Sequence, residues 1–446
     1  MSTKISPQDT FPVLGKHILL DALDLVVDLR RSKGSYIVDA RTGKRYLDFF
    51  TFVASVPIGL NHPKMTTPEF LEKLAYVAVN KPTNSDAYTT EYAEFVDTFA
   101  RVAIPSYLPH AFFVEGGSVA VENALKAAFD WKVKKNFKKG YTEERGTQVI
   151  HFQRAFHGRT GYTLSLTNTE PTKTDLYPKF KWPRILNPAI TFPLDDDNLK
   201  KVRKAEETAL GRIKEAIRQN TDDIAAIIIE PIQGEGGDNH FRKEFFVEIR
   251  RVADENDIML IFDEVQTGIG LTGKMWAHEW FVKPDMIAFG KKMQVCGILC
   301  SSRIDEVPDN VFKVASRLNS TWGGNLVDMV RSQRYLEIIQ EEKLVDNARI
   351  MGEYLLKNLE NIQAEFAGKG GKGLVSNARG RGLFCSFDLP SREARQKFRE
   401  IAFSKGAVML GSGERSLRFR PPLNISKEEI DEGMHIVRDT LSVMKD

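Results

Sequence analysis

Short hydrophobic runs alternate with longer amphipathic segments between about residues 110 and 300. The runs are almost wholly apolar, and they cover residues 111–114, 149–152, 224–229, 258–262 and 286–289. Such runs are typical of strands in a sheet that is buried on both faces. Apolar residues spaced three and four apart predict helices over residues 119–137, 199–219 and 245–256. The alternation predicts an α/β domain with a mostly parallel sheet and helices on both faces.

The two ends of the chain predict a smaller α+β lobe. Its expected elements are helices over 326–340 and 345–366, a glycine-rich loop over 368–373, a strand over 382–389, a helix over 392–405, a strand over 416–419 and a helix over 427–444. Ser426 and Glu429 form the sequence signature of a capping box before the last helix. Residues 34–39 and 46–49 predict a hairpin that joins this lobe. We therefore expect an N-terminal segment (1–60) that joins the small lobe, a large domain (61–330) and a C-terminal small domain (331–446).

Composition and charge remove several classes of function. The 446 residues include 63 basic and 60 acidic side chains, and the two signs are interleaved. Neither a nucleic acid nor an anionic membrane is therefore an expected partner. No apolar run is long enough to span a bilayer, and aspartates interrupt residues 17–29, so neither a spanning helix nor a signal peptide is expected. The predicted location is the cytoplasm.

Cysteine and histidine usage predicts neither a disulfide framework nor a metal site. The three cysteines are odd in number and form no CxxC, and the eight histidines form no HExxH. We expect free, buried thiols and no bound metal.

Residues suited to catalysis follow the predicted strands. In an open parallel sheet, ligands bind beyond the carboxyl ends of the strands. Residues 115–118 (EGGS) lead from a strand into a helix, and their free backbone N–H groups suit an anion such as phosphate. Asp263 follows one buried strand, and Lys291 follows another after Gly290. An amine in that position loses water, which lowers its pKa and favours Schiff-base chemistry.

These residues fit one cofactor, pyridoxal 5′-phosphate (PLP). Lys291 would form the Schiff base, and Asp263 would keep the pyridine nitrogen protonated so that the ring withdraws electrons. The turn Gly117-Ser118 would bind the phosphate. Phe156 and Val265 are the candidates for the two sides of the ring.

Two other classes of protein are alternatives on the residues alone. Residues 268–273 spell GxGxxG, a signature of dinucleotide binding, but that motif needs a strand directly before it and an acidic residue about 20 positions later. Here residues 263–267 intervene, and Asp285 lies only 12 positions after Gly273. A non-catalytic protein of the PLP fold is the second alternative, and the presence of both Lys291 and Asp263 argues against it.

Five motifs together resemble the class III, or ω-, aminotransferases of PLP fold type I. They are EGGSVAVENALK (115–126), FHGRTGY (156–162), EPIQGEGG (230–237), FDEVQTGIG (262–270) and PDMIAFGKK (284–292), in the order and spacing of that family. The match runs from about residue 35 to the C-terminus. It implies a seven-stranded, mostly parallel sheet, a bound PLP and a homodimer with shared active sites. Because residues 295–297 depart from the small residues that usually follow the family's lysine, Lys292 remains an alternative to Lys291.

The resemblance also implies a role for each cofactor-binding residue. Lys291 would hold the cofactor and carry protons, Asp263 would pair with the ring nitrogen, and Gln266 would bind the ring hydroxyl. The cofactor-binding set is completed by Gly117, Ser118, Phe156, His157, Val265 and, from the other subunit, Thr321.

Three segments (290–297, 317–326 and 417–423) are most similar to family members that act on the ε-amino group of L-lysine. The implied reaction converts L-lysine to 2-aminoadipate 6-semialdehyde, which cyclises to piperideine-6-carboxylate, and 2-oxoglutarate to L-glutamate. Ornithine δ-aminotransferase, 4-aminobutyrate aminotransferase and aminomutase activities remain alternatives. The implied substrate-binding residues are Arg159, Glu235, Gln266, Asn319 and Arg418.

L-lysine and L-glutamate, which donate the amino group in the forward and the reverse reaction, differ in charge at the reacting carbon. Glutamate has a carboxylate there and lysine has none. By resemblance, Arg418 binds that carboxylate, and Glu235 pairs with Arg418 when lysine is bound. Arg159 would bind the far carboxylate of either substrate through its two-pronged guanidinium.

Overall fold

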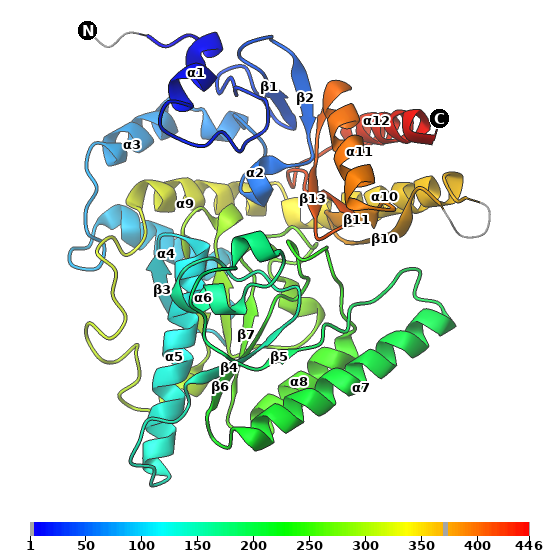
Figure 1. The fold of residues 1–446 in the computed structure, drawn as a ribbon. Helices are drawn as coiled ribbons and strands as arrows, with labels where there is room; N and C mark the ends of the chain where they lie inside the picture. Colours follow the sequence, from blue (N-terminus) through cyan, green and yellow to red (C-terminus); the bar gives the residue numbers. More distant parts are fainter. Residues whose placement is uncertain (1–3, 369–372, 446) are drawn as a thin grey trace.

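A seven-stranded sheet forms the centre of this computed structural model, which describes residues 4–368 and 373–445 (Figure 1). The order across the sheet is β3-β9-β8-β7-β6-β4-β5. Its strands are β3 (His110–Val114), β4 (Gln148–Phe152), β5 (Arg184–Ile185), β6 (Ile224–Ile229), β7 (Met259–Asp263), β8 (Met286–Phe289) and β9 (Cys296–Cys300). β9 is antiparallel to both of its neighbours, β3 and β8, and the other four pairings in the sheet are parallel. The predicted α/β class is confirmed, and β5 and β9 are strands that the sequence pattern did not predict.

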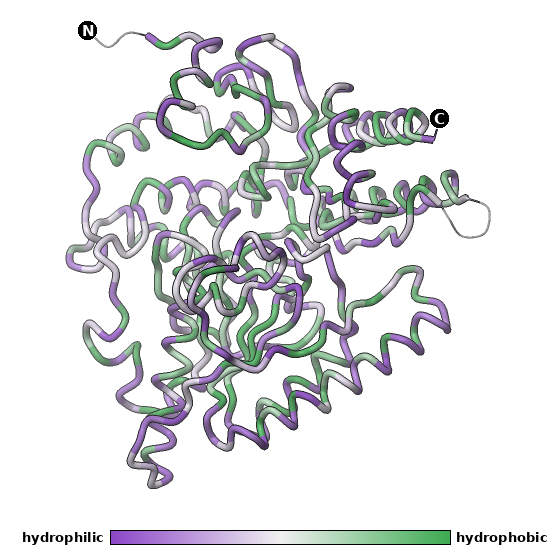
Figure 2. Tube along the Cα trace, in the orientation of Figure 1, coloured by the Kyte–Doolittle hydropathy of each residue, from purple (hydrophilic) through white to green (hydrophobic). Residues whose placement is uncertain are grey.

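Successive residues of the central strands point to opposite faces of the sheet and pack into two separate hydrophobic cores. Ile228 and Ile261 pack with helix α5 (Gly117–Lys138) on one face of the sheet. Ile229 and Phe262 belong to the core on the other face, where α8 (Lys243–Glu255) packs. Figure 2 shows this pattern as hydrophobic colour on the central strands and alternating colour along the long helix α7 (Asp196–Gln219). Burial on both faces explains why the strands are apolar at nearly every position.

The C-terminal part of the chain forms a second, antiparallel sheet with the order β10-β11-β14-β13. Its strands are β10 (Ser376–Arg381), β11 (Phe384–Asp388), β13 (Leu410–Ser412) and β14 (Ser416–Phe419), and the neighbouring helices are α10 (Leu344–Glu365), α11 (Arg392–Ser404) and α12 (Lys427–Lys445). The predicted strand over 382–389 is confirmed as β11, whereas β10 was not predicted; the two strands form a hairpin that turns at Gly382. Its φ of +54° is a backbone conformation that favours glycine. Residues 369–372 of the predicted loop 368–373 lie outside the described residues.

The N-terminal hairpin pairs with the C-terminal part of the chain. β1 (Tyr36–Val38) is antiparallel to β2 (Arg45–Asp48), and β2 is parallel to β12 (Ala407–Val408). The predicted hairpin is therefore confirmed. The predicted capping box also forms, since the Ser426 N–H donates to Glu429 Oε2 (2.8 Å) and the Glu429 N–H donates to Ser426 Oγ (3.2 Å). The domain limits at residues 60 and 330 stay a prediction.

The remaining α-helices come from the N-terminal half of the chain and from the segment before the second sheet. They are α1 (Thr10–Leu14), α2 (Thr51–Ala54), α3 (Pro68–Ala78), α4 (Thr90–Val102), α6 (Gly161–Leu166) and α9 (Leu326–Glu341). No helix within the described ranges is long and apolar enough to cross a membrane.

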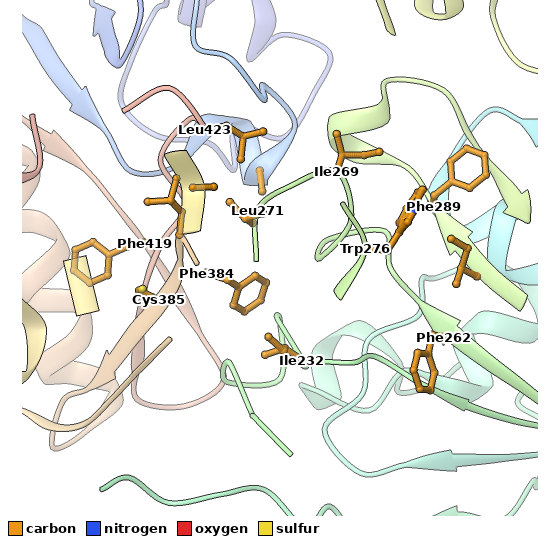
Figure 3. Packing of buried hydrophobic residues seen from close by; sticks show 14 of the residues in the cluster. Ile232, Phe262, Ile269, Leu271, Trp276, Phe289, Phe384, Cys385, Phe419 and Leu423 are labelled. Atoms are coloured by element: carbon orange, nitrogen blue, oxygen red, sulfur yellow. The ribbon is translucent and has the colours of Figure 1, made fainter. Parts of the chain in front are cut away.

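One hydrophobic cluster continues from the central sheet into the antiparallel sheet. Figure 3 shows Phe289 and Trp276 at one side of this cluster, Phe419 at the other, and Leu271 and Phe384 between them. All five side chains are essentially buried. The packing fixes the carboxyl ends of β6, β7 and β8 relative to β14, so loops from both sheets can build one site.

Candidate active site

A cavity of about 320 Å³ lies at the carboxyl ends of β6, β7 and β8. Its lining residues come from the start of α5 and from the segments that follow β4, β6, β7 and β8: Gly117, Ser118, Phe156, His157, Gly158, Arg159, Glu230, Glu235, Asp263, Val265, Gln266 and Lys291. Most of the predicted cofactor-binding residues therefore meet in one place. The topology explains why, because parallel strands deliver their following loops to the same edge of the sheet.

Lys291 reaches this cavity from a strained turn. It follows β8 and Gly290, and its φ of +49° is rare for a residue with a side chain. Burial, reinforced by the positive charge of Arg418, lowers the pKa of the Lys291 amine to about 8, against the opposing effect of Glu235. The amine makes no hydrogen bond to another described residue and is therefore available to a ligand.

Lys292, the alternative from the sequence, points elsewhere. Its side chain is buried, and its amine donates to the backbone carbonyl of Gln266 at 2.6 Å. It does not line the cavity. The two neighbouring lysines thus have separate surroundings, and only Lys291 faces the other candidate residues.

Asp263, the last residue of β7, is held by two donors. His157 Nδ1 lies 2.8 Å from Asp263 Oδ2, and the Val265 N–H donates to Asp263 Oδ1 at 3.1 Å. His157 is itself buried, and its backbone N–H donates to Thr167 Oγ1 at 2.9 Å. The carboxylate is therefore fixed in orientation where it borders the cavity.

The glycine turn before α5 forms the expected anion site. Gly116 has a φ of +97°, and α5 begins at Gly117 with the unpaired backbone N–H groups of a helix start. A Cβ atom at Gly117 would lie 3.0 Å from Val265 Cγ1, so glycine keeps this part of the cavity open. Ser118 Oγ is 2.7 Å from Thr160 Oγ1 and 2.6 Å from Thr163 Oγ1. The free N–H groups and clustered hydroxyls suit a phosphate.

Glu235 lies between two cations. Its Oε2 is 3.0 Å from Arg418 Nη1, and its Oε1 accepts a hydrogen bond from Lys173 Nζ at 2.7 Å. Burial alone would raise the pKa of Glu235, but Arg418 and Lys173 outweigh it and lower the pKa. The predicted pair of Glu235 and Arg418 therefore forms. Lys173 is an addition, and its sequence surroundings (EPTK, 170–173) contain no pattern that points to this contact.

Glu230 is a second residue that the predicted site lacked. It is buried at the end of β6, where its Oε1 accepts from the Phe156 N–H (2.9 Å) and its Oε2 from the Gly234 N–H (3.0 Å). Burial raises the pKa of Glu230 to about 7. The carboxyl group ties together the segment that carries Phe156 and the segment that carries Glu235. An acidic residue directly after a buried strand was the available signal.

The remaining predicted residues divide into two groups. Gln266 borders the cavity while its Oε1 accepts hydrogen bonds from Arg420 (3.2 and 3.3 Å), and Arg159 borders it with an exposed side chain that has no ion pair to a described residue. Asn319 and Thr321 lie outside the cavity on an exposed loop. The Thr321 carbonyl there accepts a hydrogen bond from Ser85 Oγ at 3.1 Å.

Taken together, the cavity combines four chemical functions. It offers an amine of lowered pKa without a hydrogen bond to a described residue, a carboxylate fixed by an imidazole, an anion site at a helix start and a lining carboxylate, Glu235, that pairs with Arg418 behind it. These suit a phosphorylated, planar, electrophilic cofactor and substrates that carry carboxylates.

Comparison with known proteins gives concordant matches over nearly the whole chain. The family described as aminotransferase class-III matches residues 21–441. An L-lysine-epsilon aminotransferase of Mycobacterium tuberculosis is 51% identical over 441 residues, 98% of this chain and 96% of the relative. A protein of the same name from Streptomyces clavuligerus is 48% identical over 440 residues, 98% of this chain and 95% of the relative. The solved structure described as lysine aminotransferase from M. tuberculosis in the internal aldimine form superposes with a TM-score of 0.95 at 51% identity, covering 98% of this chain and all of that one.

Proposed function

The chain belongs to the class-III aminotransferases, and from that premise we propose that it transfers the ε-amino group of L-lysine to 2-oxoglutarate with PLP as cofactor. The observation that carries the proposal is the Lys291 amine, which has a lowered pKa and no hydrogen bond to a described residue and shares a cavity with the fixed Asp263 carboxylate. Identities of 48–51% with proteins named for lysine support the choice of substrate.

The residues of the cavity fit PLP. The helix start at Gly117 and the hydroxyl of Ser118 would hold the phosphate, and Phe156 and Val265 would lie against the ring. Asp263 would pair with the ring nitrogen. When bound, the cofactor supplies a carbonyl that condenses with amines and a ring that withdraws electrons from the reacting carbon.

Lys291 would hold the cofactor and then carry the proton. An amine with a pKa of about 8 is partly unprotonated near neutral pH, so it can take a proton from the reacting carbon and return it. Asp263 keeps its orientation through His157, and a negative charge there favours a protonated ring nitrogen. Gln266 has its amide oxygen engaged by Arg420, which leaves its amide nitrogen to donate to the ring hydroxyl.

Glu235 and Arg418 would let one site accept two kinds of amino donor. With L-lysine bound, Glu235 stays on Arg418 and neutralises it beside the end of the substrate that has no carboxylate. With L-glutamate, the carboxylate on the reacting carbon takes the place of Glu235 on Arg418. Arg159, exposed and free of ion pairs to described residues, would bind the far carboxylate of either substrate.

The exposed loop with Asn319 and Thr321 would complete the site of a second copy of the chain. Both residues lie outside the cavity of their own chain. A homodimer in which Thr321 reaches the partner's phosphate and Asn319 the partner's substrate would give them a role that a single chain does not.

The test is to add L-lysine to the purified holoenzyme without a keto acid and to follow the visible absorbance of the cofactor. Loss of the visible band, and its return on addition of 2-oxoglutarate, would support the proposal. A band that responds to L-ornithine or 4-aminobutyrate but not to L-lysine would leave the family assignment intact and change the proposed substrate. Turnover that needs no keto acid would point to an aminomutase.

A further inference from the structure

The two oxygens of Glu235 are bound by cations from different parts of the fold. Lys173 ends the short helix η3 (Pro171–Lys173) and binds Oε1, whereas Arg418 lies in β14 and binds Oε2. The side chains are 13% exposed for Lys173, 26% for Glu235 and 5% for Arg418. Each cation can therefore be released while the other still pairs with the carboxylate.

Lys173 is held from other directions as well. Its amine lies 3.4 Å from Glu170 Oε2 and 5.6 Å from the centre of the Phe156 ring. Glu170 in turn binds Arg392, at the start of α11, at 2.8 Å. The ammonium group thus has a defined position that does not depend on Glu235 alone.

Displacing Glu235 from Arg418 has an electrostatic cost. A carboxylate in this partly enclosed cavity is stable as an anion only beside a positive charge or several donors. Binding of L-glutamate removes Arg418 from Glu235 and adds another negative charge nearby. A second cation already in contact with Glu235 reduces that cost, because the carboxylate keeps one ion pair throughout.

We propose that Lys173 is a specificity-determining positioning residue, which retains Glu235 when a substrate carboxylate takes over Arg418. Lys173 thereby favours the half-reactions of L-glutamate and 2-oxoglutarate over that of L-lysine. This inference rests on the proposed exchange of Glu235 and substrate on Arg418. It adds a residue that acts through Glu235 and touches neither cofactor nor substrate.

The experiment compares single-turnover half-reactions of Lys173→Gln with those of the wild-type holoenzyme. Without Lys173, Glu235 has only Arg418 as a partner, so Arg418 is harder to free. We expect the apparent dissociation constants of L-glutamate and 2-oxoglutarate to rise about tenfold, the equivalent of one lost ion pair of moderate strength. The L-lysine half-reaction should change by less than about twofold, since it leaves Glu235 on Arg418.

Three further variants separate this role from a structural one. Lys173→Arg keeps the charge and should restore most of the affinity for L-glutamate. Lys179→Gln removes a lysine from the same loop whose amine donates to the Thr174 carbonyl and not to Glu235, and it should behave as wild type. In a Glu235→Ala background, Lys173→Gln should have no further effect on L-glutamate. Cofactor absorbance and thermal midpoint, measured for each variant, report on the integrity of the site.

The outcomes are distinct for the two levels of the proposal. Equal losses in the lysine and glutamate half-reactions of Lys173→Gln, or additive losses with Glu235→Ala, would overturn the role of Lys173. If Glu235→Ala itself impaired both half-reactions equally, the exchange on Arg418 would fail. If the wild-type holoenzyme showed no half-reaction with L-lysine, the substrate assignment would fail. The effect of Lys173→Gln on the half-reaction with L-glutamate would still measure the role of Lys173.

Discussion

Two lysines stand at opposite ends of the central sheet, and the loss of water around each amine lowers the pKa of both to about 8. Lys291 follows β8 and faces the 320 Å³ cavity at the carboxyl ends of the strands. Lys132 belongs to α5 and borders a cavity of about 440 Å³ near the start of β7. By pKa and cavity size alone, Lys132 would be as good a candidate for catalysis.

The difference between the two lysines lies in their partners. Lys132 Nζ donates to the backbone carbonyls of Asn256 (3.1 Å) and Asp257 (2.8 Å), so its amine is already engaged in hydrogen bonds within the protein. Lys291 Nζ donates to no described residue, and its neighbours Glu235 and Asp263 are themselves fixed by other groups. A lowered pKa therefore marks a buried amine, and only the absence of internal partners marks one that is available for chemistry.

The largest effect is expected from a matched pair of substitutions, Lys291→Met and Lys132→Met. Lys291→Met removes both the attachment of the cofactor and the proton carrier, so kcat/KM should fall by about 10⁴-fold, the upper end for loss of a general acid–base group. Lys132→Met leaves two carbonyls without a donor, so it should lower the free energy of unfolding by about 1–3 kcal/mol. Steady-state kinetics per bound cofactor and chemical denaturation measure the two effects. Substantial residual turnover in Lys291→Met, or loss of turnover in correctly folded Lys132→Met, would contradict the roles assigned to the two lysines.

Two carboxylates, Asp263 and Asp257, lie at opposite ends of the sheet and are expected to differ in the same way as the two lysines. Asp263→Asn should lower kcat by about 100-fold, the scale for loss of one preorganised electrostatic partner. Asp257 instead pairs with Lys135 (2.7 Å) and Lys139 (3.3 Å) on the surface of α5 and its end. Asp257→Asn should therefore leave kcat within about twofold of wild type, because surface ion pairs contribute little. Similar losses in both variants would contradict the assignment of Asp263.

The sequence predicts the site best where a residue lies at the carboxyl end of a strand. Asp263 ends β7 and Lys291 lies two residues after β8, and the carboxyl ends of neighbouring parallel strands meet at one edge. Lys173 is different, since it lies in an irregular segment and meets Glu235 only through the tertiary fold. Lys291 and Lys292 also could not be separated by sequence, because their divergence depends on the left-handed φ of Lys291.

The secondary structure was also predicted well in some regions and missed in others. Strands that alternate with helices were predicted with only small shifts at their ends, because each combines an apolar run with a following amphipathic segment. Strand β9 was missed because only the short 3-10 helix η5 (Lys291–Met293) separates it from β8, and not the α-helix that usually connects parallel neighbours. Strand β10 was missed because its residues, Ser376–Arg381, are mostly polar or small and form no apolar run, whereas its partner β11 is apolar at most positions.

The smallest expected effect concerns pH and the rate at which the apoenzyme takes up PLP. Only the unprotonated amine attacks the cofactor carbonyl, and Lys291 has a pKa of about 8. The rate should therefore rise about tenfold between about pH 7 and about pH 9 and then level off, whereas an ordinary lysine would continue to gain up to about pH 10.5. Stopped-flow absorbance gives the profile. Because Arg418 lowers the pKa of Lys291 and Glu235 raises it, Arg418→Gln should move the plateau to higher pH and Glu235→Ala to lower pH.

Reduction with borohydride followed by peptide mapping should find the cofactor on Lys291 and none on Lys132. Labelling of Lys132 would mean that its carbonyl partners do not withhold the amine, and the distinction between the two lysines would fall.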